Sequence, residues 1–190
     1  MGKLYMIRHG KTDWNLKGLT QGSVDIPLNE DGRNEARKVA SEIDLSDIDI
    51  CIASPLQRAS ETAQIITQGK LEIIYDDLLK ERSFGDYEGK QISWDVITRH
   101  WDYNINDESD NIESIRSCLD RAKLMLEKIE SEYSDKNVLI VSHACLIKCI
   151  HFNIVGYNEE TDFLSFNPQN ATLYEYDMEN IHKRILYKEM

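Results

Sequence analysis

The feature that most constrains the fold is a set of four short apolar runs rich in β-branched residues. Each run is bounded by polar residues and lacks the polar alternation of a strand with one wet face, so the pattern predicts strands buried on both sides. The runs are LYMIR (4–8), IDICIAS (48–54), LEIIYD (71–76) and NVLIVS (137–142). Sheets covered on both faces are mostly parallel, and we therefore expect a largely parallel central sheet.

Helical patterns separate these runs. They span residues 30–43, 55–68 and 112–133. Pro55 suits the first turn of the second helix, because a first-turn residue needs no backbone N–H. The alternation of strand and helix predicts a three-layer α/β/α sandwich.

The C-terminal residues predict two further strands. They span residues 171–177 and 182–189, with a turn at 178–181 between them, and we place them at a sheet edge. Such an edge would suit a homodimer. Because 190 residues with 41% hydrophobic content suffice for one core, we expect a single domain over residues 1–190.

The composition excludes several classes of partner. A net charge of −12 disfavours nucleic acids and anionic membranes, so any anion site must be local. The chain shows no signal peptide and no apolar stretch of membrane-spanning length, which indicates a cytoplasmic protein. Its four cysteines are irregularly spaced, and we expect reduced thiols.

Residues 91–111 interrupt the alternation of strand and helix. Two tryptophans, Trp94 and Trp101, precede an acidic and asparagine-rich run there. A solvated connection is one interpretation. The other is a small cap over a functional site, since long insertions in compact domains are often lids.

Residues with suitable chemistry follow the predicted strands. In open α/β sheets ligands bind beyond the carboxyl ends of the strands. Arg8 and His9 follow the first run, Arg58 lies one helical turn after the second, and His143 follows the last. Glu81 comes shortly after the third run. Taken singly, each residue is more typical of a structural or surface role. Together, two arginines, two histidines and one carboxyl group suit a phosphoryl group.

Five sequence blocks carry a family resemblance. They are RHGKTDWN (8–15), TQGSVDIPLNEDGRNEA (20–36), SPLQRASETA (54–63), LLKERSFGDYEG (78–89) and VLIVSHA (138–144). In this order and spacing the chain resembles the histidine phosphatase superfamily, which includes the cofactor-dependent phosphoglycerate mutases and small phosphatases such as α-ribazole phosphatases. The resemblance covers most of the chain.

The resemblance implies a role for each matching residue. His9 is the expected nucleophile, and a backbone carbonyl should hold one of its ring nitrogens. Glu81 is the expected proton donor and later base, with Asp86 and Glu88 as alternatives. The other expected contacts with phosphate or substrate are Arg8, Gly10, Thr12, Asn15, Gln21, Gly22, Arg58, His143 and Ala144.

Two residues depart from the family pattern, and one cluster permits another interpretation. Ala144 stands where glycine is common, and Lys148 stands where arginine is common. A zinc site is the rival interpretation of a group of four residues, but buried thiols explain its cysteines better. That group is His143, Cys145, Cys149 and His151. We expect no metal and no cofactor.

Three functions compete on this pattern. The favoured one is hydrolysis of a small phosphomonoester through a phosphohistidine on His9. A phosphoglycerate mutase is the second, since Arg82 after Glu81 resembles the mutases, although the acidic stretch 102–113 would repel a second phosphate. A non-catalytic phospho-ligand-binding protein is the third. Aromatic residues of the excursion would suit a nucleoside-like leaving group such as α-ribazole phosphate, or would simply pack in the core.

Overall fold

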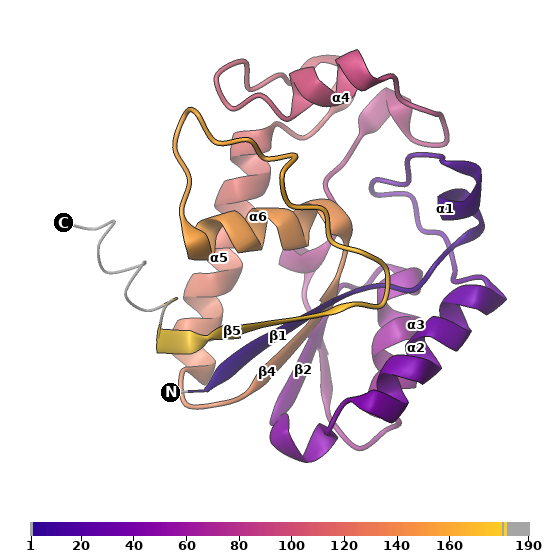
Figure 1. Cartoon of the computed structure of the whole chain (residues 1–190), viewed down its shortest axis with the longest axis vertical. Helices are drawn as coiled ribbons and strands as arrows, with labels where there is room; N and C mark the ends of the chain where they lie inside the picture. The colour runs from indigo at the N-terminus through magenta and orange to yellow at the C-terminus, as the bar shows by residue number, and fades with distance from the viewer. Residues whose placement is uncertain (1, 180, 182–190) are drawn as a thin grey trace.

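The computed structural model describes residues 2–179 and 181. Five strands form one sheet in the order β3-β2-β4-β1-β5, in which only β5 is antiparallel to its neighbour. The strands are β1 Lys3–Arg8, β2 Ile50–Ala53, β3 Ile73–Tyr75, β4 Val138–Ser142 and β5 Leu173–Asp177. Four predicted strands are thus confirmed, β1 with one residue more and the other three with trimmed ends. Residues 173–177 form the predicted edge strand (Figure 1).

Helices cover both faces of the sheet, as the apolar runs predicted. Along β1, Leu4 and Met6 belong to one buried cluster, whereas Tyr5 and Ile7 belong to a second cluster on the opposite face. The first cluster packs under α5 Ile115–Tyr133 and α6 Ala144–Val155, and the second under α2 Glu30–Glu42 and α3 Gln57–Thr67. The three-layer α/β/α sandwich is therefore confirmed.

Two local predictions were wrong. Pro55 lies before α3 and not in its first turn, because Leu56 is extended (ψ 134°) and its N–H bonds the Ser54 hydroxyl, which delays the helix to Gln57. The expected turn at 178–181 is helical at Met178, Glu179 and Ile181. Helical spacing places Met178 and Ile181 together in the core, which explains the preference. The strand predicted at 182–189 lies outside the described residues.

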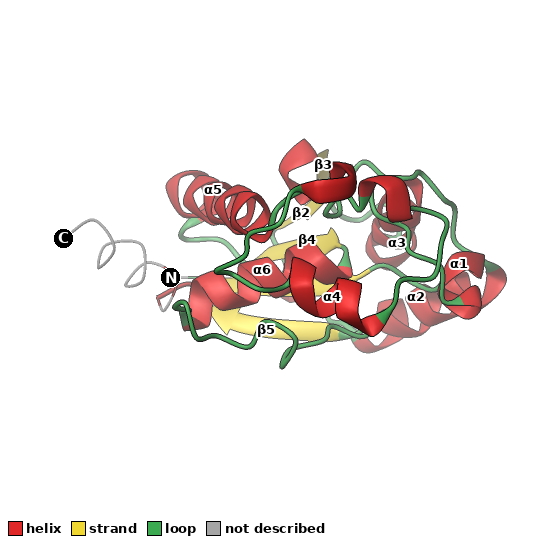
Figure 2. Cartoon of the chain, turned by 90° about the horizontal axis from the view of Figure 1, so that it is seen from above, coloured by secondary structure: helices red, strands yellow, loops and turns green. Residues whose placement is uncertain are grey.

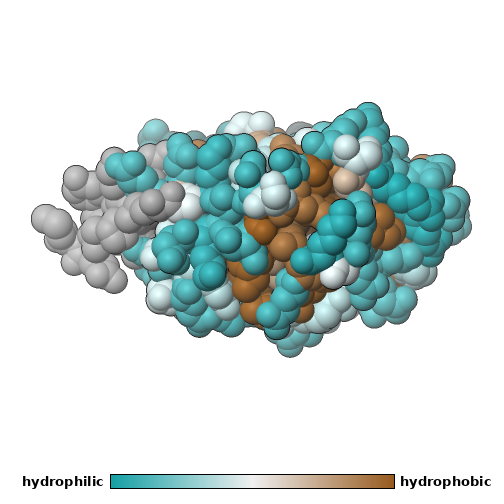
Figure 3. Space-filling model, turned by 90° about the horizontal axis from the view of Figure 1, so that it is seen from below, coloured by the Kyte–Doolittle hydropathy of each residue, from teal (hydrophilic) through white to brown (hydrophobic). Residues whose placement is uncertain are grey.

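Residues 91–111 leave the sheet and carry α4 Trp94–His100. In Figure 1 α4 lies at the top of the molecule, and the view from above in Figure 2 places it in front of the strands near α6. The short α1 Asp13–Lys17 lies beside this end of the molecule. None of the described helices qualifies as a membrane span. Apolar residues also gather on the face seen from below (Figure 3), so apolar surface alone does not mark a site.

Candidate active site

His9 lies just past the end of β1, 2% exposed. Its backbone N–H donates to Ser142 O at the end of the neighbouring β4, and its Nδ1 lies 2.7 Å from Gly10 O. A carbonyl only accepts, so Nδ1 carries the proton and Nε2 keeps its lone pair, as the sequence predicted. Burial lowers the pKa of His9 well below its usual range, and the charges of Arg58 and Arg8 add to this effect. The imidazole is therefore neutral, with a lone pair on Nε2.

Two arginines lie near this ring, Arg58 buried and Arg8 half-buried. Arg58 is fully buried in the first turn of α3, where it donates to Val24 O and Gly22 O at 2.8 and 2.7 Å. Arg8 donates to Pro168 O at 2.8 Å. The Nε of each guanidinium is buried and makes no hydrogen bond to any described residue. Buried polar groups are almost always paired, so these donors are suited to an anion.

His143 faces His9 from the end of β4, with 5.2 Å between the ring centroids. Its Nε2 lies 2.8 Å from Ser54 Oγ, and that oxygen also accepts from the Leu56 N–H. The Ser54 hydroxyl can thus donate to Nε2, which leaves the proton of His143 on Nδ1. This Nδ1 is buried without a partner in the described part of the chain. His143 therefore offers a third donor on a neutral ring whose pKa burial lowers strongly.

The segment after His9 forms a tight turn into α1. A Cβ on Gly10 would lie 2.3 Å from Gly32 O, so only glycine allows the backbone to approach α2 this closely. Thr12 is the N-cap of α1, and Asn15 completes the capping box by accepting from the Thr12 N–H and hydroxyl. The side-chain oxygen of Asn15 is thus committed to the cap, and its NH₂ is the group that remains as a donor.

The Gln21–Gly22 loop is attached to the segment that carries the acid. Gly22 has φ +51°, and its carbonyl accepts from Arg58. Glu88 accepts from the Ser23 N–H at 2.8 Å and the Phe84 N–H at 3.0 Å, which joins the two loops. Gln21 is buried beside them. The predicted residues Gln21 and Gly22 therefore border the arginine site.

Glu81 is the acid whose position suits catalysis. Its carboxylate accepts from the N–H groups of Cys145 and Leu146 in the first turn of α6, at 3.1 to 3.2 Å. Its charge also acts on both Arg8 and Arg58. The two alternative candidates for the acid make other contacts: Asp86 accepts from the Asn111 side chain, and Glu88 joins the two loops. Glu81 therefore lies between the arginine site and α6.

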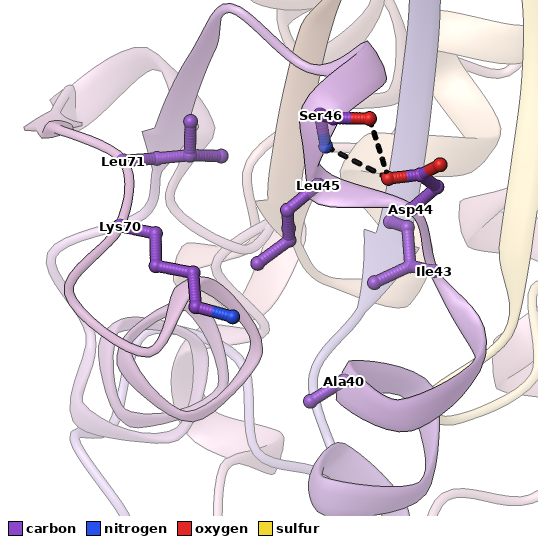
Figure 4. A pocket seen from close by; sticks show the side chains of 7 residues that line it. All are labelled: Ala40, Ile43, Asp44, Leu45, Ser46, Lys70 and Leu71. Atoms are coloured by element: carbon purple, nitrogen blue, oxygen red, sulfur yellow. Dashed lines mark hydrogen bonds between the residues drawn. The ribbon is translucent and has the colours of Figure 1, made fainter.

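A cavity of about 330 Å³ lies between Cys145, whose N–H binds this acid, and the excursion. Its walls come from α4, α6 and the loops at 84 and 164–167; the lining residues are Phe84, Trp94, Ile97, Trp101, Ala144, Cys145, Lys148, Leu164 and Asn167. A different hollow lies between the C-terminal end of α2 and the loop before β3 (Figure 4). It has one hydrogen-bonded pair, Asp44 with Ser46, and none of the predicted site residues.

Sequence reasoning missed several supporting residues. Asn170 donates to His9 O at 2.8 Å, and Thr62 accepts from the Gly10 N–H. The signal for Asn170 was the NPQN segment at 167–170, a turn composition that we did not connect with the site. The residues of the rival zinc interpretation do not form one site, because His151 stacks on Phe166 and Cys149 contacts Cys118. The described residues contain no cluster of three or more metal-ligand side chains.

Comparisons with known proteins identify the family of this chain. The chain is 37% identical over 161 residues to the uncharacterized phosphatase PhoE of Bacillus subtilis (84% of this chain, 81% of that protein). It is 31% identical over 195 residues to the putative phosphoserine phosphatase 2 of Hydrogenobacter thermophilus (98% and 95%). A phosphoserine phosphatase mutant from Entamoeba histolytica, solved in complex with phosphoserine, superposes with a TM-score of 0.82 at 30% identity, covering 92% and 90%. Residues 4–189 match the model of the histidine phosphatase superfamily (branch 1), and the chain belongs to this family.

Proposed function

We propose that this protein hydrolyses small phosphomonoesters through a phosphohistidine formed on His9. Phosphatase activity is the general part of this proposal, which the family assignment supports. The specific part is the phosphohistidine on His9. It rests on three buried hydrogen-bond donors that lack a partner and lie beside the neutral His9 imidazole. Arg8 Nε, Arg58 Nε and His143 Nδ1 are buried polar atoms with no hydrogen-bond partner in the described chain.

The first half-reaction transfers the phosphoryl group to the enzyme. His9 Nε2 attacks phosphorus, and the bond from phosphorus to the ester oxygen breaks as the new P–N bond forms. The two guanidiniums and His143 bind the phosphoryl oxygens and stabilise their charge in the transition state. Glu81 is the group that donates a proton to the leaving alcohol oxygen.

The second half-reaction regenerates the enzyme. The alcohol departs, and water enters in its place. Glu81, now a carboxylate, takes a proton from this water as its oxygen attacks phosphorus, and the P–N bond breaks to return the electron pair to Nε2. Inorganic phosphate then leaves. The hydrogen bond from Nδ1 to Gly10 O holds the same tautomer in both steps.

Hydrolysis is favoured over a mutase by the contacts of Arg82. In the sequence, Arg82 after Glu81 resembles the mutases, but in the structure its guanidinium donates to Glu113 O and His100 O at 2.7 and 2.8 Å. Arg82 is fully buried and fixes the backbone of the excursion. Its Nη1 has no partner among the described residues, but the two backbone contacts hold the guanidinium in place. These contacts support a structural role for Arg82 and hence water as the phosphoryl acceptor.

The test is turnover of p-nitrophenyl phosphate in EDTA by the wild type and His9→Ala. We expect the variant to lose at least about 10³-fold in kcat, since removal of a nucleophile is among the largest single losses. Rapid quenching with ³²P-labelled substrate should trap an acid-labile, alkali-stable phosphoenzyme in the wild type only. Equal turnover by both proteins would refute the nucleophile.

The substrate range needs a separate panel. Phosphoserine and α-ribazole phosphate are two small phosphomonoesters that it should include, with 3-phosphoglycerate plus bisphosphoglycerate as the mutase assay. Free phosphate as the product supports hydrolysis. Formation of 2-phosphoglycerate without free phosphate would contradict it.

A further inference from the structure

Lys148 is a nearly buried ammonium without a carboxylate partner. The residue is 6% exposed, in the second turn of α6. Ion pairs hold six other lysines, all more exposed: Lys3, Lys11, Lys38, Lys80, Lys123 and Lys128. Among the described residues no carboxylate pairs with Lys148, whose Nζ lies 4.3 Å from the centre of the Trp101 ring. An unpaired buried charge is costly, so this position suggests an anionic ligand.

Lys148 lies on the wall of the cavity next to the candidate phosphoryl site. Ala144 lines the same cavity and follows His143 directly. Residues four apart share one face of a helix and are about 6 Å apart along its axis. At one end the cavity is lined by Ala144 and by Cys145, whose N–H binds Glu81, and Lys148 lies about one helical turn further along its wall. A leaving group of a few atoms spans this distance.

The rest of the cavity suits an organic group that carries one negative charge. Its walls include three aromatic rings: Phe84, Trp94 and Trp101. The Arg82 guanidinium lies 4.9 Å from the Trp101 ring, so this tryptophan contacts two cations and is held in place by both. The phosphoryl site uses two arginines and two histidines for a dianion. The single positive charge of Lys148 instead matches the single negative charge of a carboxylate.

We propose that the cavity binds a leaving group with a carboxylate, which pairs with Lys148 over the Trp101 ring. The substrate class is then a phosphomonoester of a hydroxy acid, aliphatic or aromatic. This inference rests on the proposed phosphatase function, whose phosphoryl site lies next to the cavity. Burial lowers the pKa of Lys148, and a bound carboxylate would restabilise its charged form.

The test compares substrates that differ only in the carboxylate. One pair is 3-phosphoglycerate with glycerol 1-phosphate, and the other is 4-carboxybenzyl phosphate with 4-carbamoylbenzyl phosphate. In at least one pair the wild type should prefer the carboxylate about 10-fold or more in kcat/KM, the effect of one hydrogen bond to a charged group. Lys148→Met keeps an unbranched chain of similar length under Trp101 and should abolish the preference.

Two further variants make the result interpretable. Lys148→Arg should retain the preference, and Lys123→Met, which removes an exposed lysine paired with Glu127, should leave it unchanged. If Lys148→Met is unstable, Lys148→Gln replaces it. A wild type without preference in either pair, or a preference that survives loss of the charge, overturns the inference.

A binding measurement separates this inference from the phosphatase proposal. The phosphonate analogues of the benzyl pair cannot be hydrolysed, so calorimetry reports the carboxylate preference without turnover. A preference lost in Lys148→Met supports the site even if p-nitrophenyl phosphate is not hydrolysed. Conversely, normal turnover with equal affinity for both phosphonates refutes the subsite and leaves the phosphatase function intact.

Discussion

The two ends of the candidate active site are built differently. At the phosphoryl end, His9 and His143 follow adjacent parallel strands, and both are buried and held by backbone or hydroxyl contacts. At the leaving-group end, α4 and its flanking loops supply much of the wall, and Trp94 is 66% exposed. The first end is a rigid part of the sheet, whereas the second belongs to an excursion from it.

This contrast indicates which part of the site fixes the chemistry and which part selects the substrate. Sites on rigid elements keep reacting groups aligned, and loops vary without disturbing them. Glu81 lies at the boundary, because it comes from the loop after β3 but binds the N–H groups at the start of α6. Substitutions at the two ends should therefore differ in kind, with large effects on kcat/KM at the boundary acid and small effects on KM at the outer wall.

Glu81→Gln should give the largest of these effects. Glutamine still accepts the Cys145 and Leu146 hydrogen bonds but has no proton to donate. We expect kcat/KM to fall about 10²- to 10⁴-fold for an alkyl phosphate. It should fall far less for p-nitrophenyl phosphate, because nitrophenolate leaves unprotonated. The parameter kcat/KM is chosen because it reports the phosphorylation step and excludes hydrolysis of the phosphohistidine.

Glu88→Gln is the matched control for this experiment. Its carboxylate joins the Ser23 and Phe84 backbones and does not contact α6 in the described hydrogen bonds. Because glutamine keeps an acceptor oxygen for these N–H groups, any loss of activity should be small and equal for both substrates. If Glu81→Gln also lowered both equally, Glu81 would not be the acid, and the distinction between the boundary and the outer wall would fail.

The stability of the phosphoryl end should depend on pH. His143 is neutral in the folded state because its pKa lies well below the unfolded value of about 6.5. The unfolded chain therefore binds more protons below pH 6.5, so stability falls as the pH drops through this range. Each such histidine contributes a slope of about 1.4 kcal/mol per pH unit.

Urea unfolding between pH 5 and 7 measures this slope directly. His143→Gln should reduce it by about 1.4 kcal/mol per pH unit, since glutamine does not titrate. The control is His151→Gln on α6, a half-buried ring whose pKa burial also lowers, and its smaller desolvation should give a smaller change. A slope unaltered by His143→Gln would show that this ring is not held neutral by burial.

The same contrast explains what the sequence could predict. The runs at 4–8 and 137–142 are buried on both faces, so their composition reveals the strands, and the residues that follow them are then at the sheet end by topology alone. His9 and His143 were predicted in this way, and Arg58 was predicted from its place one helical turn after the run at 48–54. Ser54 and Asn170 were not, because their contacts with His143 and His9 join residues 89 and 161 positions apart.

Lys148 shows the same limit at the other end of the site. The sequence marked it only as a departure from arginine, whereas its burial, its contact with Trp101 and its place in the cavity depend on how α4 packs over α6. The delayed start of α3 is a smaller example. A hydrogen bond from Leu56 to Ser54 outweighed the usual preference of proline for a first helical turn.

Trp94→Ala should give the smallest effect and tests the outer wall. Because the ring is 66% exposed, its loss should change the free energy of unfolding by no more than about 0.5 kcal/mol. KM for benzyl phosphate should rise a few-fold while kcat stays constant, as expected when only uniform binding is lost. Leu124→Ala, at a 54% exposed position of α5 outside this cavity, should change neither parameter. A large fall in kcat for Trp94→Ala would instead mean that the excursion aligns the reacting groups, and the two ends would then act as one unit.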